Sequence, residues 1–272
     1  MSRVEQVRPF YAEVGINVET YDVRQQSIVA GTSGEGDVEF YAALAGETGG
    51  PVLELGSGTG RVAWALAEEG FEVVGLEKSD AMLMAAEAKR WKEKRDAADL
   101  ARFEKGDMAG FDLDERFPLV LVPYRSFQAL LEPGRQRSCL ACCRAHMEDD
   151  ALLVIHVFDP RHDLLVPDQD VELQLPTVRD PISGNIVETA IIEVEQDPVR
   201  QTFRQVWRFT EFDGQGVPLR QEHEELRMRW ASRQEMRWLF ELEGLEVVDE
   251  YSDFEGSPPT YGAEQVWVLR KA

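Results

Sequence analysis

The stretch with the clearest chemical potential is VLELGSGTGRVAWALAEEG, which runs from Val52 to Gly70. A short apolar run leads into glycines at 56, 58 and 60, and a segment with helical spacing follows. Glycines let a backbone approach a ligand closely, and the N–H groups at the start of a helix point at it. The stretch therefore predicts a strand, a turn and a helix that together bind an anion or a nucleoside.

The spacing of the glycines bears on which cofactor this turn would bind. Nicotinamide and flavin dinucleotides are bound by G-x-G-x-x-G after a strand. Here Gly56, Gly58 and Gly60 form G-x-G-x-G, and Arg61 stands where the third glycine of the dinucleotide form belongs. The spacing disfavours a dinucleotide, although a nicotinamide-dependent oxidoreductase stays as an alternative.

Two carboxylates frame the turn. Glu54 lies two residues before the first glycine, inside the apolar strand. A carboxylate there either accepts hydrogen bonds from the N–H groups of the turn or orients a cationic ligand. Glu77 ends the next predicted strand, FEVVGLE. In doubly wound folds a carboxylate at that place accepts hydrogen bonds from the ribose hydroxyls of a nucleoside.

These motifs resemble those of the class I S-adenosylmethionine-dependent methyltransferases of the small-molecule type. The resemblance rests on E-x-G-x-G-x-G, on the acidic end of the second strand, on S-x-x-M-L from Ser79, and on GDM at 106–108. It covers residues 37–160 strongly and 230–270 in outline. It implies S-adenosylmethionine as cofactor and the transfer of a methyl group to a nitrogen or oxygen nucleophile of a small molecule by in-line displacement.

The resemblance also implies a set of cofactor-binding residues. They are Tyr21, Glu54, Gly56, Ser57, Gly58, Arg61, Glu77, Lys78, Met82, Asp107, Met108, Val122, Pro123 and Tyr124.

The roles implied for the first part of this set concern the methionine and ribose groups. The backbone from Gly56 to Gly58 would line the methionine part, and Glu77 would hold the ribose. Arg61 would approach the methionine carboxylate or, alternatively, lie on the surface of its helix. Tyr21, in the sequence YD, would fold over the cofactor, and Tyr11 is the competing candidate.

The remaining implied roles concern the adenine and the sulfonium. Lys78 and Met82 would flank the adenine, while Asp107 would bind its amino group and Met108 would pack nearby. The family places the residues after the fourth strand close to the sulfonium, and here they are Val122, Pro123 and Tyr124.

Two positions depart from the family pattern. Pro118 stands where relatives often carry an aspartate before the fourth strand, which puts the local geometry at the entrance to the active site in doubt. Ser57 stands where many relatives carry cysteine, a minor change.

Methyl transfer needs a general base only if the nucleophile starts protonated. The candidates for such a role are His162, which follows the fifth predicted strand, His223 and Tyr124. His146 and His156 are predicted to be structural. The alternative to catalysis is a protein that binds S-adenosylmethionine without turnover.

Three cysteines raise the question of a metal. Cys139, Cys142 and Cys143 share one face of a predicted helix with His146. Free cysteine behaves as a small buried hydrophobe, and no second cluster completes a tetrahedral site, so we expect core packing and no metal.

Strands that alternate with helices from residue 51 to residue 158 predict a parallel, doubly wound α/β sheet, preceded by a helix that Asp37 would cap. Three segments of period-two alternation between residues 185 and 231 then predict an antiparallel meander inserted in this chain. SRQEMRWLFELEG predicts a helix with a capping box, and two strands close the chain. The expected fold is a Rossmann-like sheet of seven strands, the last antiparallel, with a β-meander substrate lobe.

The expected organisation is a single methyltransferase domain over residues 1–272. It comprises an N-terminal cap segment (1–36), a cofactor-binding core (37–160), the inserted meander (161–231), and a C-terminal helix with two strands that complete the sheet (232–272).

Composition limits the classes of partner. The formal net charge is −22, and no cluster of Lys and Arg suits a nucleic-acid backbone or an anionic membrane. We find neither a signal peptide nor an apolar run long enough to span a bilayer. The expected partner is a small molecule, the expected location is the cytoplasm, and the oligomeric state is not predicted.

Overall fold

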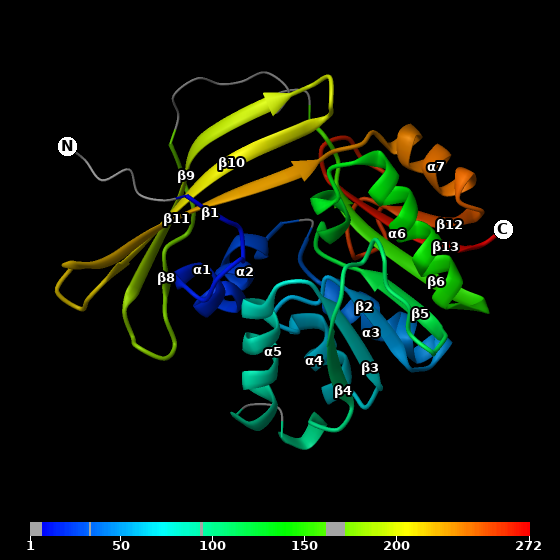
Figure 1. Cartoon of the computed structure of the whole chain (residues 1–272), viewed down its shortest axis with the longest axis horizontal. Coiled ribbons are helices and arrows are strands. Elements are labelled where there is room, and N and C mark those ends of the chain that lie inside the picture. Colours follow the sequence, from blue (N-terminus) through cyan, green and yellow to red (C-terminus); the bar gives the residue numbers. More distant parts are fainter. Residues whose placement is uncertain (1–6, 33, 93–94, 162–171) are drawn as a thin grey trace.

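A computed structural model describes residues 7–32, 34–92, 95–161 and 172–272 of the chain (Figure 1). The described residues form two β-sheets with helices around them. One sheet has seven strands in the order β12-β13-β6-β5-β2-β3-β4, and the other has six. The first carries the predicted cofactor turn, and the second contains the predicted meander.

The seven-stranded sheet confirms the predicted fold class. Neighbouring strands from β4 to β6 are parallel, whereas β13 is antiparallel to both β6 and β12. The central strands read as continuous apolar runs because helices cover both faces of the sheet. The strands are β2 (Val52–Leu55), β3 (Val73–Glu77), β4 (Ala101–Lys105), β5 (Phe117–Val122), β6 (Met147–Phe158), β12 (Leu245–Tyr251) and β13 (Glu264–Lys271).

Two cores, one on each face, hold the helices to this sheet. The larger cluster includes Cys139, Cys143 and Phe240 from α6 and α7, and the other includes Tyr41 and Leu66 from α3 and α4. Cys139 and Cys143 thus contribute to the core, as expected, whereas Cys142 is only partly buried. The helices are α3 (Asp37–Thr48), α4 (Arg61–Glu68), α5 (Asp80–Lys92), α6 (Pro133–His146) and α7 (Arg233–Leu242), with short 3-10 turns η1 (Arg95–Ala97) and η2 (Ser126–Ala129).

One half of the capping box predicted for α7 forms, because the backbone N–H of Glu235 donates to Ser232 Oγ at 3.3 Å, while the Glu235 carboxylate accepts from Gln201 and Arg229. The capping prediction for α3 is wrong. Gly36 occupies the cap position, and Asp37 is the first helical residue. The carboxylate of Asp37 instead pairs with the guanidinium of Arg61, which offers a charged partner that a cap does not.

The predicted meander is confirmed as an antiparallel sheet of β9 (Ile186–Asp197), β10 (Thr202–Phe212) and β11 (Pro218–Arg229). Three further strands join it: β7 (Leu173–Gln174) and β8 (Val178–Arg179) along β9, and β1 (Arg8–Pro9) along β11. Each of these is only two residues long, so the sequence shows no periodicity that would predict it.

The N-terminal segment forms α1 (Ile16–Glu19) and α2 (Tyr21–Val29), which lie between the meander and α5 in Figure 1. On the meander side, the fully buried Glu224 accepts hydrogen bonds from Asn17 Nδ2 at 2.6 Å and from the backbone N–H of Tyr11 at 3.1 Å. On the core side, Thr59 Oγ1 donates to Asp22 Oδ1 at 2.6 Å. The segment is therefore bonded both to the meander and to the glycine turn.

None of the helices in the described residues is long and apolar enough to cross a membrane.

Candidate cofactor site

The glycine turn joins the end of β2 to the start of α4. All three glycines have a positive φ, which L-residues rarely adopt: 70° at Gly56, 56° at Gly58 and 73° at Gly60. A Cβ at Gly60 would lie 2.7 Å from Phe103 Cζ, whereas a Cβ at Gly58 would meet no atom within 4 Å. Gly60 is thus required by packing, and Gly58 presents its backbone to open space where a ligand can approach.

This difference predicts unequal costs for two alanine variants. Gly60→Ala is expected to lower the free energy of unfolding by about 2 kcal/mol or more, because strain adds to overpacking. Gly58→Ala is expected to cost only about 1 kcal/mol of backbone strain. Urea unfolding of the two variants beside the unmodified protein measures this. Equal losses would contradict the packing role of Gly60.

The turn lies at the edge of the sheet where parallel strands place ligands. β2 pairs with β3 on one side and with β5 on the other, so the strand order reverses direction at β2. The carboxyl ends of these three strands meet at this edge. In open α/β sheets the ligand crevice lies outside such a reversal point.

The carboxylate of Glu77 accepts two backbone hydrogen bonds, one from the glycine turn and one from the loop after β3. Its Oε2 accepts from the backbone N–H of Gly58 at 2.9 Å, and its Oε1 accepts from that of Ser79 at 2.7 Å. Bonding to the turn was one of the two roles expected of Glu54, and the structure gives it to Glu77. Each carboxylate oxygen can accept a further hydrogen bond, so Glu77 retains the capacity to bind two hydroxyls.

Glu54 is buried beside the same turn. Its side chain is 2% exposed, and its Oε2 has no hydrogen-bond partner among the described residues. Burial raises the pKa of this carboxyl to about 8, against the opposing charge of Arg61. The Oγ of Ser57 is likewise buried and without a described partner. Two unsatisfied polar groups at one place fit a polar, cationic ligand such as the methionine part of S-adenosylmethionine.

A small cavity of about 30 Å³ gathers many of the predicted residues. The predicted members of its wall are Tyr21, Glu54, Gly56, Ser57, Arg61, Pro123 and Tyr124, and they are joined by Val62 and Ser126. Tyr21 lines this cavity, and the ring of the competing candidate Tyr11 packs edge-on against it at 5.6 Å.

Arg61 is held inside the site and is not a surface residue of its helix. Its guanidinium pairs with Asp37 and lies 5.7 Å from the centroid of the Tyr124 ring. Hydrogen bonding to Asp37 raises the pKa of this already basic group against the opposing effect of burial, so the positive charge is permanent. A fixed cation at the cavity can meet a carboxylate of a ligand.

The residues predicted for the adenine lie outside this cavity. Asp107 accepts from Lys78 Nζ at 2.9 Å and from Arg135 Nη2 at 2.6 Å, and these bonds outweigh partial burial and lower the pKa of its carboxyl. Met82 is buried against Val18 of the N-terminal segment. The structure therefore brings Lys78 and Asp107 together beyond the ends of β3 and β4, while Met82 lies in the first turn of α5.

Met108 and Val122 lie nearer to the turn. A Cβ at Gly56 would lie 3.2 Å from Met108 Cε, and Val122 is the buried last residue of β5.

Sequence reasoning missed a cluster behind Tyr124. Tyr124 and Arg125 both adopt positive φ, 47° and 65°, a strained arrangement for two consecutive non-glycine residues. Arg125 Nη2 bonds Glu264 Oε1 at 2.6 Å, and the other oxygen of Glu264 lies 3.0 Å from His156 Nε2. These partners outweigh burial and lower the pKa of Glu264 to about 2. The cluster fixes Tyr124 at the cavity.

Two of the three candidates for a general base lie among the described residues. Tyr124 lines the cavity, and burial raises the pKa of its hydroxyl. His223 lies on β11 opposite Arg208 of β10. His162 lies outside the described residues.

The comparisons with known proteins agree with this geometry. Residues 52–150 match the model of a methyltransferase domain family. A cypemycin N-terminal methyltransferase from a Streptomyces species is 25% identical over 253 residues, which are 93% of this chain and 94% of that protein.

Solved structures have the same fold. The CcbJ methyltransferase from Streptomyces caelestis superposes with a TM-score of 0.77 at 25% identity, covering 97% of this chain and 98% of that one. An S-adenosylmethionine-dependent methyltransferase from Clostridium acetobutylicum has a TM-score of 0.76 at 13% identity, covering 95% and 100%.

The fold, the turn and these matches define a class I methyltransferase. The chain is an S-adenosylmethionine-dependent methyltransferase.

Proposed function

We propose that this enzyme transfers the methyl group to a nitrogen atom of a small molecule or a short peptide by in-line displacement. Bound S-adenosylmethionine supplies the methyl group on a sulfonium, which is the electrophile of such a reaction. The names of two similar proteins support a nitrogen acceptor: one is an N-terminal methyltransferase and another a glycopeptide N-methyltransferase.

The observation that carries the choice of nitrogen is the nature of the cavity wall. An alcohol must lose its proton during transfer, whereas a neutral amine attacks without a base. Burial raises the pKa values of Tyr21 and Tyr124, so both hydroxyls stay protonated near neutral pH. Among the described residues of the wall, Glu54 alone has a carboxyl group, and we assign it to the cofactor. The wall therefore suits an acceptor that needs no base.

The chain's own residues would divide the work of binding. We assign Glu54 and Ser57 to the amino group of the methionine part, Arg61 to its carboxylate, and Glu77 to the ribose. We assign Lys78, Met82, Asp107 and Met108 to the adenine side, as the resemblance implies. Val122, Pro123 and Tyr124 would then lie along the path of the methyl group, and the rings of Tyr21 and Tyr124 would exclude water from it.

The proposed function also assigns different parts of the chain to the cofactor and to the acceptor. Residues 37–160 and 232–272 would bind the cofactor, while 161–231 and the segment 1–36 would cover the acceptor. The clustering of the three cysteines supports a reducing cytoplasm as the place of action.

Isothermal titration with S-adenosylmethionine, S-adenosylhomocysteine and NAD is the first test. We expect saturable binding of the first two and none of the third, because Arg61 occupies the position of the glycine that a dinucleotide turn requires. Binding of NAD in preference to S-adenosylmethionine would support the oxidoreductase alternative and overturn the proposal.

A panel of matched amines and alcohols then tests the acceptor atom. We expect product from amines alone, with a rate that rises with pH as the neutral amine accumulates. Turnover of the alcohols would refute the nitrogen assignment. Cofactor binding without turnover of any acceptor would favour a non-catalytic binding protein.

A further inference from the structure

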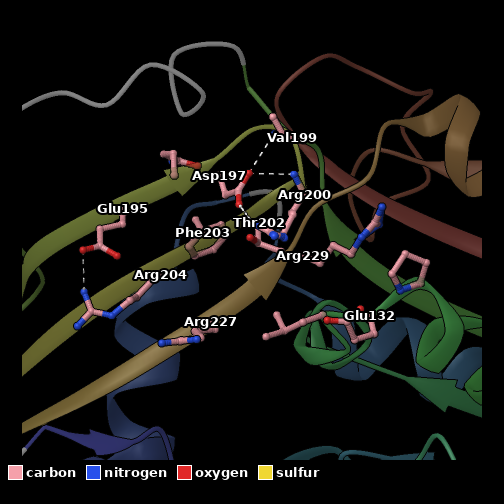
Figure 2. A pocket seen from close by; sticks show the side chains of 13 residues that line it. Glu132, Glu195, Asp197, Val199, Arg200, Thr202, Phe203, Arg204, Arg227 and Arg229 are labelled. Atoms are coloured by element: carbon pink, nitrogen blue, oxygen red, sulfur yellow. Dashed lines mark hydrogen bonds and ion pairs between the residues drawn. The ribbon is translucent and has the colours of Figure 1, made fainter.

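A second, larger pocket lies away from the glycine turn, between the meander and the start of α6 (Figure 2). Its volume is about 530 Å³, within the range of pockets that bind small molecules. The ends of β9, β10 and β11 form one wall, and Leu131, Glu132 and Pro133 form the other. None of the residues assigned to the cofactor lines this pocket.

The wall is unusually basic for this protein. The whole chain carries 51 acidic against 29 basic residues. The pocket reverses this balance with four arginines and three carboxylates, namely Arg200, Arg204, Arg227, Arg229, Glu132, Glu195 and Asp197. In Figure 2 the arginines stand along the meander side, and Glu132 lies on the core side.

Each of the four arginines pairs with at least one carboxylate, and two of them pair with carboxylates of the neighbouring strands or turn alone. Arg204 bonds Glu193 at 2.8 Å and also pairs with Glu225, while Arg200 Nη1 bonds Asp197 Oδ2 at 2.9 Å. Arg204 is thereby neutralised. Arg200 is 80% exposed and keeps donors that face solvent.

The other two have donors to spare. Arg227 bonds Glu225 through Nε alone at 2.6 Å, and within the described residues neither terminal nitrogen has a partner. Arg229 has a side chain only 8% exposed, and its Nε is buried without a partner among the residues described. A buried guanidinium with an unmet donor favours an anion beside it.

Arg229 is also held rigidly. Its Nη2 bonds Gln201 Oε1 at 2.8 Å and Glu235 Oε1 at 3.0 Å, so the meander and α7 both fix the group. A preorganised guanidinium binds an oxyanion with less loss of entropy than a flexible one.

A row of contacting side chains links the wall of the pocket to the candidate active site. Phe203 lines the pocket, and its ring lies 5.9 Å from that of Phe158. The guanidinium of Arg125 lies 5.5 Å from the Phe158 ring, and Arg125 follows Tyr124 of the cofactor cavity. These contacts place the arginine pocket beside the candidate active site.

We propose that this arginine pocket binds an anionic group, a carboxylate or a phosphate, which the methyl acceptor carries at a distance from its reactive nitrogen. The inference rests on the proposed function, because it names a chemical feature of the same acceptor. Carboxylate and phosphate share the planar or forked oxygen geometry that guanidinium groups bind.

The test uses the whole protein saturated with S-adenosylhomocysteine and two simple probes, succinate and inorganic pyrophosphate. Each is titrated into the unmodified chain, into Arg227→Gln and into Arg229→Gln. Arg270→Gln is the matched control, since Arg270 is an exposed, singly paired arginine outside the pocket. We expect each pocket variant to weaken binding about tenfold, the effect of one lost charged hydrogen bond. The control should bind as the unmodified protein does.

The probe that binds tells carboxylate from phosphate, and saturable binding of either one, weakened in the pocket variants alone, supports the proposal. Arg227→Gln keeps the test decisive if Arg229→Gln does not fold. No saturable binding of either anion, or binding that Arg227→Gln leaves unchanged, overturns it. Titration of S-adenosylhomocysteine into each variant separates this result from a failure of the proposed function, because the cofactor should bind all of them equally.

Discussion

Glu54→Gln is expected to raise the free energy of unfolding at pH 7 by on the order of 3 kcal/mol. The folded-state pKa of Glu54 is about 8, far above the value of an exposed carboxyl. At a pH between these two pKa values, Glu54 therefore keeps its proton in the native protein and has lost it in the unfolded chain. Stability is lost as pH rises through this window, up to the folded pKa. Glutamine does not ionise, so the variant does not lose this stability as the pH rises.

Urea unfolding of both proteins between pH 4 and pH 9 measures this effect. The difference in stability should be near zero at the acid end, where both states are protonated, and should grow toward pH 8. Glu264→Gln is the opposite control, because its pKa is lowered to about 2 by His156 and Arg125. That variant should lose stability at neutral pH. If stability depends on pH in the same way in Glu54→Gln and in the unmodified protein, Glu54 is ionised in the native state and the prediction is wrong.

Glu54→Gln is also expected to bind S-adenosylmethionine at least tenfold more weakly, because the change removes the proposed partner of the ligand's cationic amino group. Binding should also release about one proton at pH 7 from the unmodified protein, because the cation favours the ionised carboxylate. Titrations in buffers of different ionisation enthalpy measure this proton. Its absence would remove Glu54 from the cofactor site.

Glu77→Ala is expected to weaken the binding of S-adenosylhomocysteine by roughly ten- to a hundredfold, about 1–3 kcal/mol. The change removes the proposed acceptor of the ribose hydroxyls and leaves the N–H groups of Gly58 and Ser79 without their acceptor. The turn therefore loses both a ligand contact and its own support. A loss of stability of about 1–2 kcal/mol should accompany the loss of affinity.

Titration calorimetry gives the affinity, and Glu72→Ala is the control. Glu72 is an exposed carboxylate at the start of the same β-strand region. Glu77→Gln separates the two effects, since its amide oxygen still accepts one hydrogen bond. Unchanged affinity in Glu77→Ala would make the ribose assignment wrong.

The sequence predicts the parts of the fold that follow from local pattern. Continuous apolar runs indicate the central strands, and period-two alternation indicates the meander. The position of Arg61 after three closely spaced glycines disfavours a dinucleotide turn on spacing alone. Each of these signals lies within about twenty residues, where periodicity and turn chemistry act.

Long-range pairs explain most of what the sequence does not reveal. Arg125 and Glu264 are 139 positions apart, and no local pattern links them. Asp37 resembles a helix cap because its true partner, Arg61, lies two elements further along the chain. Asp107 likewise meets Arg135 across the site. Such pairs depend on which strand ends meet, which the fold decides.

The Asp22–Thr59 bond has a consequence for how the enzyme handles its two ligands. Asp22 also pairs with Lys89 of α5 at 2.5 Å, while Asn17 of the same segment is bonded to Glu224 of the meander. The segment is thus a mechanical link between the turn and the lobe. Free-energy coupling is reciprocal: if filling the turn tightens the segment's hold on β11, then an occupied lobe must tighten cofactor binding by the same factor.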